Sequence, residues 1–307
     1  MENSNNKISS IEIDFGDGNG YLNTFGGRSS GQEREIEVNY SSVGEKIIKA
    51  KVTLSNGKTL RSRSKFNIRS LSEISYDTYI PVSGSWNGGT YTANAYILYG
   101  CGNNDKLRKP VIVTDGFDPG NVRNFPGIYE YFNRENLVEK LIADGYDVII
   151  LDFDEGAGYI QRNAHVLIST VNEVNRQLEE NGSYEQLVVI GPSMGGIIAR
   201  YALSYMEQNN LNHNTRLYIS FDSPHLGANI PLGLQYWLRF FANKVKEQEA
   251  IEGKERIYSI ACKQLLTYHI NQSNFRRDLI NDKYYSFPSQ CRNVAFSNGS
   301  RNNSEHL

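Results

Sequence analysis

The sequence predicts an α/β protein with a mostly parallel sheet, helices on both faces, a helical lid insertion and a small N-terminal all-β sandwich domain. Three observations predict this class. Continuous apolar runs recur from residue 111 onward, as in strands buried on both sides of a parallel sheet. Amphipathic helical patterns lie between these runs. Short alternating segments rich in turn residues occupy the first 72 residues, so we expect two domains, 1–72 and 76–307.

The first domain carries the pattern of antiparallel strands joined by tight turns. The strands are predicted at residues 11–14, 35–38, 47–54 and 64–68. Asn56-Gly57, between the last two, is a strong hairpin signal because both residues accept the positive φ of a tight turn. No helical period of useful length accompanies them. The segment is therefore predicted to be all-β.

From residue 76 onward, strand patterns alternate with helical patterns. The strands are predicted at residues 91–99, 111–114, 148–151, 187–190, 217–221 and 293–296, the first of them alternating like an edge strand. Apolar stripes at helical spacing predict helices over 137–142, 167–178 and 197–205. Strand–helix alternation with short connections indicates a parallel sheet covered on both faces.

Composition excludes several classes of function. Lys and Arg number 32 against 34 Asp and Glu, with no long basic run, so nucleic-acid binding has no electrostatic support. No apolar run has transmembrane length, and no signal peptide opens the chain. No His, Asp or Glu group has metal-ligand spacing, so neither a metal nor a cofactor is expected. Cys101, Cys262 and Cys291 form no disulfide framework, although a Cys262–Cys291 bridge stays open.

Residues Gly191-Pro192-Ser193-Met194-Gly195 form a Gly-x-Ser-x-Gly motif between a buried strand and an amphipathic helix. A sharp turn of this kind exposes a serine at the end of a sheet. A serine nucleophile also needs a base and donors for the developing oxyanion. The backbone N–H of Met194, at the helix N-terminus, is the first expected donor. Phe117, in the glycine-rich loop after strand 111–114, is the second.

Together these features resemble the α/β-hydrolase family, and within it the lipase-like branch that includes GPI inositol-deacylase relatives. The resemblance covers roughly residues 76–300 and is carried by 191–195, 115–119 and Asp222-Ser-Pro-His-Leu-Gly227. It implies that Ser193 attacks an ester carbonyl and forms an acyl-enzyme that water hydrolyses. The implied partner is a small-molecule ester or lipid substrate.

The same resemblance orders the remaining catalytic residues as acid, then histidine. Asp222, at the end of the strand after the serine helix, is the candidate acid, and an acid after strand 293–296 is the alternative. His306 follows in the right order and is the candidate base. The family has a further strand before its histidine. We therefore expect truncation at the C-terminus and leave the base unassigned.

The other four histidines are weaker candidates for the base. His165 and His213 lie too early or on the wrong side of the expected order. His225 is structural in the lipase segment that it resembles. His269 falls in the inserted helical region and is expected to be a surface residue.

An aromatic helical pattern interrupts the strand–helix rhythm within residues 228–290. Leu234, Trp237, Leu238, Phe241 and Val245 fall at helical spacing. Two interpretations stay open with equal weight: a cap over an acyl pocket, with 227–231 as its hinge, or a helix that covers core. The charged tract 244–254 is expected to be a solvated helix face.

A second resemblance concerns the N-terminus. Asp14-Phe-Gly-Asp-Gly18, followed by Val38-Asn-Tyr-Ser-Ser-Val-Gly44, resembles a polycystic-kidney-disease-type (PKD) module over roughly residues 1–70. It implies a spacer or binding unit of secreted proteins, contact with an extracellular polymer, and a secreted or cell-surface location. Further strands normally precede this turn, so N-terminal truncation is expected. Asp14 and Asp17 are interpreted as turn residues rather than a calcium site.

The leading functional hypothesis is a serine ester hydrolase carrying an accessory β domain. The first alternative is a binding or adhesion protein whose hydrolase-like domain is inactive. The second is a peptidase or acyltransferase that uses the same nucleophile. All three share the fold and differ in what happens at Ser193.

Overall fold

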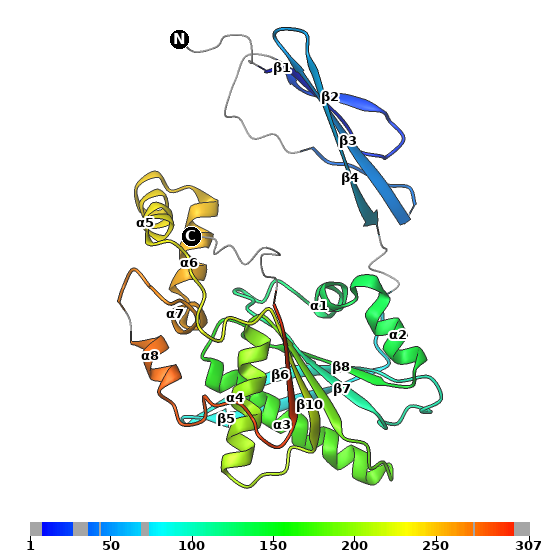
Figure 1. Cartoon of the computed structure of the whole chain (residues 1–307), viewed down its shortest axis with the longest axis vertical. Coiled ribbons are helices and arrows are strands. Elements are labelled where there is room, and N and C mark those ends of the chain that lie inside the picture. Colours follow the sequence, from blue (N-terminus) through cyan, green and yellow to red (C-terminus); the bar gives the residue numbers. More distant parts are fainter. Residues whose placement is uncertain (1–7, 27–35, 43, 69–73, 273, 298–307) are drawn as a thin grey trace. The chain divides into compact units, whose positions relative to one another are not determined.

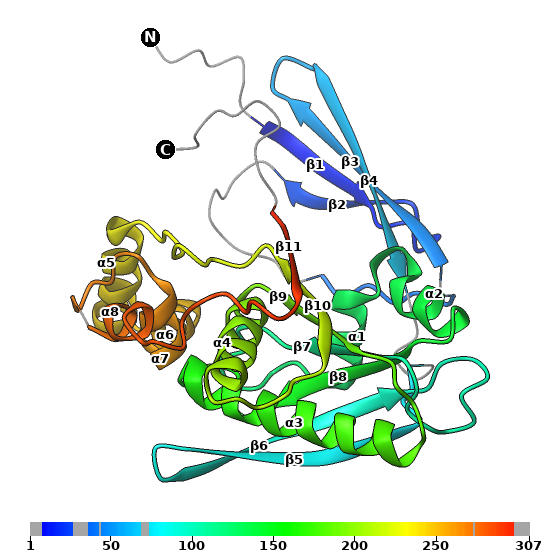
Figure 2. The ribbon, with the colours of Figure 1, turned by 60° about the horizontal axis from the view of Figure 1, so that its bottom comes forward.

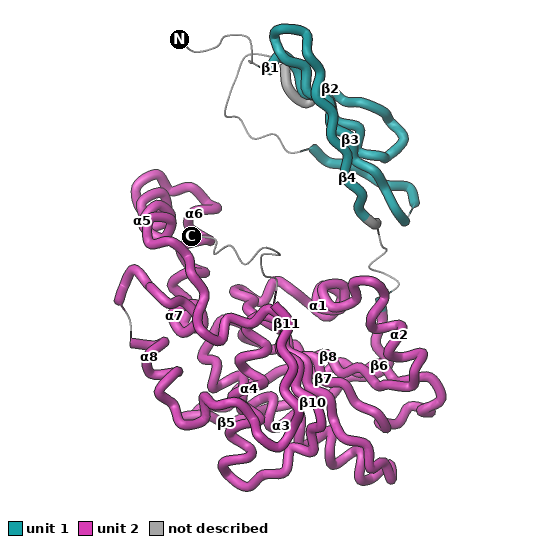
Figure 3. Tube along the Cα trace, in the orientation of Figure 1, with its two compact units in different colours: residues 1–74 teal, residues 75–307 magenta. Residues whose placement is uncertain are grey.

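The computed structural model describes residues 8–26, 36–42, 44–68, 74–272 and 274–297 (Figure 1). It divides into two compact units, Met1–Ile74 and Ser75–Leu307, each with its own sheet (Figure 3). The hydrophobic core of buried residues runs from Val82 to Tyr285 and so belongs to the second unit. In the described part of the chain, no helix is both long and apolar enough to cross a membrane.

The first unit contains one antiparallel sheet in the order β2-β1-β3-β4. Its strands are β1 (Ile8–Asp14), β2 (Tyr21–Gly26), β3 (Gly44–Leu54) and β4 (Thr59–Ile68). The all-β prediction is confirmed, and in the described residues it takes the form of a single sheet where a sandwich would pack two. The expected strand at 35–38 is wrong for residues 36–38, which are irregular, and Glu35 lies outside the described residues.

Both turns singled out in the first unit are present, although only Gly57 of the Asn56-Gly57 pair has a positive φ. Gly57 adopts φ +81°, and the N–H of Leu54 donates to the carbonyl of Lys58 at 2.9 Å, which closes the β3–β4 hairpin. The Asp14 carboxylate accepts from the Gly16 N–H at 2.9 Å and pairs with Lys49. Asp17 likewise accepts from its neighbour Asn19 at 3.1 Å. The kind of module to which this sheet belongs stays a prediction.

The second unit is built on a seven-stranded sheet in the order β11-β10-β9-β7-β8-β6-β5. The strands are β5 (Thr78–Trp86), β6 (Gly89–Leu98), β7 (Pro110–Thr114), β8 (Asp147–Phe153), β9 (Leu187–Pro192), β10 (Thr215–Phe221) and β11 (Arg292–Phe296). Strands β8, β7, β9, β10 and β11 are parallel, whereas β5 and β6 are antiparallel. All six strands predicted here are present. The edge, however, is the unpredicted β5, and β6 lies inside the sheet.

Helices cover both faces of this sheet (Figures 1 and 2). They are α1 (Phe125–Phe132), α2 (Leu137–Ala143), α3 (Ile160–Glu180) and α4 (Met194–Gln208), with the 3₁₀ turn η3 (Arg134–Asn136) between the first two. Helices α1 and α2 pack on β8, whereas α3 packs on β5 and β6, and α4 on β9 and β10. The connection from β7 to β8 and the connection from β8 to β9 run in opposite directions across the sheet. Because both crossovers are right-handed, their helices lie on opposite faces.

The insertion between β10 and β11 is helical, as expected. It contains α5 (Leu232–Phe240), the π-helical turn η4 (Phe241–Val245), α6 (Gln248–Tyr258), α7 (Ile260–Leu265) and α8 (Phe275–Ile280). We call α5 to α8 the cap; they cluster together beside the sheet (Figure 2).

The chain returns from the cap along α4, which holds it by side-chain hydrogen bonds. Tyr201 donates to Asp282 at 2.8 Å and Arg200 donates to the carbonyl of Tyr285 at 2.7 Å. At the end of α4, the Glu207 carboxylate accepts from the backbone N–H of the residue at 289 and of its neighbour at 290, both at 2.7 Å.

The strand order reverses direction between β7 and β9. The chain goes from β7 to β8 on one side and then to β9 on the other, and Val113 pairs with Ile190 across the two strands. Loops at such a switch point diverge to opposite faces and leave a crevice at the carboxyl ends of the strands. The loop after β7 and the turn after β9 therefore flank this crevice. These two segments carry Phe117 and Ser193.

Candidate active site

Ser193 occupies a strained turn between β9 and α4. Its backbone has φ 49° and ψ −125°, a conformation that residues other than glycine rarely adopt. The Ser193 N–H donates to the carbonyl of Phe221 at 2.8 Å, which fastens the turn to β10. The side chain is half-buried. This geometry is that of the strand–turn–helix serine motif which the sequence predicts.

The flanking glycines are required because backbone passes where a side chain would lie. A Cβ on Gly191 would be 2.3 Å from the backbone carbon of Gly195. A Cβ on Gly195 would be 2.6 Å from the carbonyl oxygen of Thr114 at the end of β7. Gly196 is similarly closed, with Ser223 Oγ 2.1 Å from the position of a Cβ. The turn is therefore packed against both neighbouring strands.

The two expected oxyanion donors lie next to this turn. Met194 is fully buried. Because it is the first residue of α4, its N–H is one of the amides that have no partner within the helix. A Cβ on Gly116 would be 3.6 Å from Ser193 Cβ and 3.9 Å from the Met194 nitrogen. The 115–118 loop, which carries Phe117, therefore approaches the serine turn at Gly116.

Acidic side chains surround this loop. Asp115, Asp118 and Asp152 are 2%, 3% and 8% exposed, and the last of them lies at the end of β8. Burial raises the pKa of Asp115 to about 6, although Arg123 acts in the opposite direction. Burial, together with the neighbouring carboxylate of Asp115, raises the pKa of Asp152 to about 7. Neither Asp152 nor Arg123 belongs to a motif that marks it in the sequence.

Asp222 follows β10 at the same edge of the sheet as Ser193. Phe221 pairs with Pro192, so the two candidate residues come directly after partners in neighbouring strands. Asp222 has φ 49°, is exposed, and donates its N–H to the carbonyl of Phe296 in β11 at 2.7 Å. The structure therefore brings Asp222 to the strand end next to Ser193.

The described histidines point their nitrogens elsewhere. His225 contacts Ser220 and Arg200, and burial lowers its pKa to about 4. His213 contacts Glu207 at 3.2 Å, and His269 contacts the carbonyl of Ile257 at 3.1 Å. His269 is buried, which corrects the expectation of a surface residue. His165 packs edge-on against the ring of Tyr205.

His306, the candidate base, lies outside the described residues. Within the described ranges, no histidine makes a hydrogen bond to Ser193. The base therefore stays a prediction.

One cavity borders the serine turn, and another lies within the cap. One of about 530 Å³ is lined mostly by apolar side chains of α1, α2 and the strand ends. Its lining residues are Tyr131, Phe132, Arg134, Leu137, Ile190, Pro192 and Phe221. The Pro192 and Phe221 positions place it beside the serine turn.

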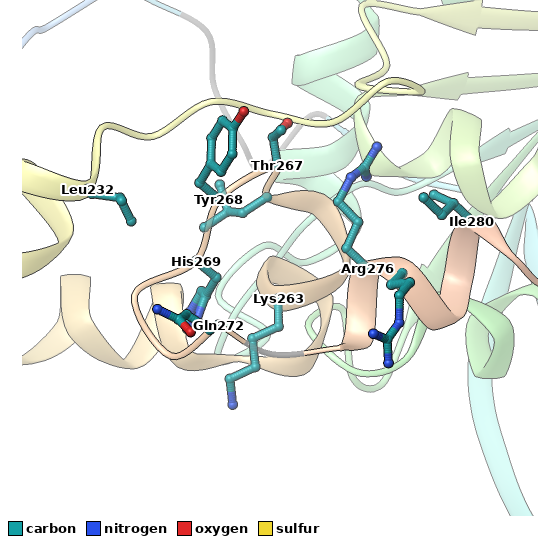
Figure 4. A pocket seen from close by; sticks show the side chains of 10 residues that line it. Leu232, Lys263, Thr267, Tyr268, His269, Gln272, Arg276 and Ile280 are labelled. Carbon is teal, nitrogen blue, oxygen red and sulfur yellow. The ribbon is translucent and has the colours of Figure 1, made fainter.

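A second cavity, of about 470 Å³, lies in the cap between α5, α7 and α8, where Figure 4 shows Lys263, Tyr268 and Arg276 around it. Arg276 donates to the carbonyl of Gln264 at 3.2 Å, and the Lys263 ammonium lies 5.6 Å from the centre of the Phe275 ring. These cations therefore contribute to packing within the cap.

Helix α5 presents apolar side chains in two directions. Leu238 packs with the buried cluster Ile257, Cys262 and Leu266, and Phe117 of the 115–118 loop packs against the same cluster. Trp237 and Phe240 are 52% and 56% exposed. The cap thus contacts the loop that carries one of the expected oxyanion donors.

The three cysteines are free thiols, so the Cys262–Cys291 bridge is absent. Among the residues that the structure describes, no three His, Cys, Asp or Glu side chains are grouped to hold a metal.

Similar structures include several esterases. Brefeldin A esterase, described as a bacterial homologue of human hormone sensitive lipase, is 16% identical, with 48% of this chain and 39% of that chain covered and a TM-score of 0.36. An esterase from Rhizomucor miehei is 14% identical over 68% and 59% of the two chains, with a TM-score of 0.40. An esterase from Pyrobaculum calidifontis is 11% identical over 74% and 78%, with a TM-score of 0.42. The match thus spans about two fifths of the length of brefeldin A esterase.

The sequence matches none of the curated proteins with which it was compared. A family model, described as PGAP1-like alpha/beta domain, matches residues 120–292, more than half of the chain. The matched range contains the serine turn, α4, the Asp222 strand end and the cap. With its mixed, mostly parallel sheet and its helices on both faces, the chain has an α/β-hydrolase fold and belongs to the family of PGAP1-like α/β domains.

Proposed function

We propose that this protein is a serine ester hydrolase that cleaves carboxylic esters, including lipid esters, through an acyl-enzyme on Ser193. The observation that supports this most directly is the strained backbone of Ser193, at φ 49°, beside a loop that approaches the Met194 nitrogen. Strain of this kind persists where the surrounding structure enforces it, and at a strand–turn–helix junction it exposes a hydroxyl to a substrate.

In the proposed reaction, the Ser193 hydroxyl attacks the ester carbonyl while a base takes its proton. The N–H groups of Met194 and Phe117 hold the negative charge that develops on the carbonyl oxygen. The alcohol leaves with a proton, and water then attacks the acyl-enzyme and releases the acid. Asp222 is the proposed acid that orients the base, and His306 is the proposed base from its order in the chain.

The proposed substrate has an apolar acyl group. The cavity of about 530 Å³ beside Pro192 and Phe221 is lined mainly by aromatic and aliphatic side chains, which favour hydrocarbon over small polar acids. Trp237 and Phe240 add exposed apolar surface to α5, the helix whose Leu238 packs on the same cluster as Phe117. We propose that the cap covers the acyl group during the reaction.

The test is covalent labelling with a fluorophosphonate probe, together with hydrolysis of p-nitrophenyl butyrate. We expect Ser193→Ala to lose both, and Ser83→Ala, which removes an exposed hydroxyl from β5, to keep both. A folded wild-type protein that is neither labelled nor active would contradict the enzyme and favour a binding protein. Products from a matched ester, amide and alcohol acceptor separate ester hydrolysis from peptide cleavage and acyl transfer.

A further inference from the structure

We infer that Arg123 is a positioning residue for the oxyanion hole, because its guanidinium holds the loop that carries the Phe117 N–H against the serine turn. This inference deepens the proposed function and rests on it. Arg123 lies six positions after Phe117, just before α1. The polar contacts of its guanidinium go to Phe117, Asp115 and Asp118 and not to Ser193, so it acts through the loop.

Arg123 contacts the loop on both sides of the peptide that contains the Phe117 N–H, the proposed donor. Its Nη2 donates to the carbonyl of Phe117 at 2.8 Å. The same nitrogen lies 3.2 Å from Oδ1 of Asp115. The Phe117 N–H belongs to the peptide between Gly116 and Phe117, which lies between these two anchors. Because Gly116 has no side chain to limit its rotation, external anchors are what fix this peptide.

Asp118 anchors the end of the loop. Its carboxylate accepts from the Arg123 backbone N–H at 2.9 Å, and its Oδ1 lies 3.9 Å from Arg123 Nε. The Asp118 N–H donates to the carbonyl of Gly156 at 3.3 Å, which ties the loop to the segment after β8. Gly156 is closed to a side chain, because a Cβ there would be 2.9 Å from the Asp118 backbone oxygen.

On its inner side the loop lies close to the serine turn. A Cβ on Gly116 would just reach van der Waals contact, at 3.4 Å from the Pro192 carbonyl and 3.6 Å from Ser193 Cβ. The serine turn therefore limits inward movement to about the size of a methyl group, while Arg123 opposes outward movement. A backbone donor held from both sides keeps its direction while charge develops on the substrate, which is the condition for oxyanion stabilisation.

Arg123 is the cation that pairs with the buried carboxylates around this loop. Asp115, Asp118 and Asp152 are all buried, and Arg123 lies within ion-pair distance of the first two. Asp115 Oδ1 has the Arg123 guanidinium as its ion-pair partner, whereas Asp152 Oδ1 has no hydrogen-bond partner among the described residues. A guanidinium presents donors in a rigid fork, so it reaches the Phe117 carbonyl and two carboxylates together. A lysine at the same position would supply the charge without this geometry.

The position of Arg123 is itself fixed by the start of α1. Asn124 caps this helix, with its side chain accepting from the Gly127 N–H at 3.4 Å, and Pro126 follows within the first turn. The Arg123 guanidinium also lies over the Tyr131 ring, 5.8 Å from its centre. The helix therefore provides a rigid base from which the side chain reaches the loop.

The experiment compares Arg123→Lys with Arg176→Lys, a control that removes an exposed guanidinium from the far end of α3. We expect Arg123→Lys to lower kcat on p-nitrophenyl butyrate on the order of 10- to 100-fold, with KM nearly unchanged. A trifluoromethyl ketone mimics the oxyanion. Its inhibition constant should rise by the same factor by which kcat/KM falls. Arg176→Lys should resemble the wild type in all three quantities.

Other outcomes separate the possibilities. A folded Arg123→Lys protein with unchanged kcat, or with only KM raised, would overturn the inference. If that variant does not fold, Asp115→Asn keeps the side-chain shape and weakens the ion pair. A proportional loss of kcat and of inhibitor affinity in Asp115→Asn would then support the inference, and no loss would overturn it. Wild-type protein without turnover that depends on Ser193 would instead refute the proposed function, and the role of Arg123 with it.

Discussion

The hydroxyl of Ser220 lies 2.7 Å from Nε2 of His225. On the other side of the ring, Arg200 approaches Nδ1 at 3.5 Å, and because arginine is only a donor, Nδ1 accepts. The ring is then neutral, and its Nε2–H donates to Ser220. Burial and the charge of Arg200 lower the pKa of His225 to about 4, in agreement with a neutral ring. Both nitrogens of His225 are therefore engaged, Nε2 with β10 and Nδ1 with α4.

His225→Gln should lower stability without removing the nucleophile. Loss of the contacts to Ser220 and Arg200 should decrease the free energy of unfolding by about 1–3 kcal/mol. The rate of fluorophosphonate labelling per folded molecule should stay within a factor of two or so of the wild type, since His225 does not touch Ser193. Urea unfolding and labelling time courses measure the two effects. A folded variant with labelling lost would show that His225 serves as the base.

Gly191→Ala should destabilise the protein strongly. The new methyl group would lie 2.3 Å from backbone atoms of Gly195 and Gly196, which cannot move without displacing Ser193. We expect a loss of about 3 kcal/mol or more and no esterase activity. Gly233→Ala in α5 is the matched control: no atom lies within 4 Å of its Cβ position. It should be neutral or stabilise the protein by up to about 1 kcal/mol. Equal unfolding midpoints for the two variants would contradict the packing argument.

Asp152→Asn should change the dependence of stability on pH. The pKa of Asp152 is about 7 in the fold, against 3.8 for an unperturbed aspartate. As pH falls from about 7 to about 4, the folded state therefore binds a proton that the unfolded state does not, and the free energy of unfolding rises. Above this range the buried carboxylate is charged and destabilises the fold.

The variant should consequently be more stable than the wild type at about pH 8, by a few kcal/mol at most, and the difference should shrink toward about pH 4. Urea unfolding at several pH values measures this. Asp144→Asn, at an exposed helix end, is the control. A constant difference between Asp152→Asn and wild type across this range would contradict a raised pKa.

Asp222→Asn and His306→Ala test the proposed acid and base together. If both residues act on Ser193 as one unit, each substitution should lower kcat about 10³-fold or more, and the double variant should lose little beyond either single one. KM should change little, because neither residue is proposed to bind substrate. Steady-state kinetics on p-nitrophenyl butyrate give both constants. A near-normal rate for either single variant would remove that residue from the mechanism.

The sequence predicted the parallel strands and the serine turn because both have local signals. Strands β7 to β10 are short apolar runs, and the conformation of Ser193 follows from the glycines on either side. Strand β5 was missed because Pro81 and Gly84 interrupt its pattern. Pro81 is tolerated since β5 is an edge strand. Gly84 is needed because a Cβ there would lie 2.5 Å from backbone atoms of His165 in α3.

The parts of the site that depend on contacts between distant segments could not be predicted in the same way. Asp152 and Asp115 are 37 positions apart in the sequence and come together because β7 and β8 are neighbours in the sheet. In the sequence Arg123 has the pattern of an ordinary charged loop residue. Only the structure shows that it contacts the 115–118 loop. Acidic residues directly after buried strands were the available signal, since parallel strand ends meet at one edge.

Helix α4 begins directly after Ser193 and, further along, binds the chain that returns from the cap. Tyr201, Arg200 and Glu207 each hold this returning chain, between Asp282 and Gln290. The C-terminal end of the cap is thereby attached to the helix that follows the serine turn. If a ligand displaces the cap, we expect α5 and α6 to move while this attachment and the backbone of Ser193 stay in place.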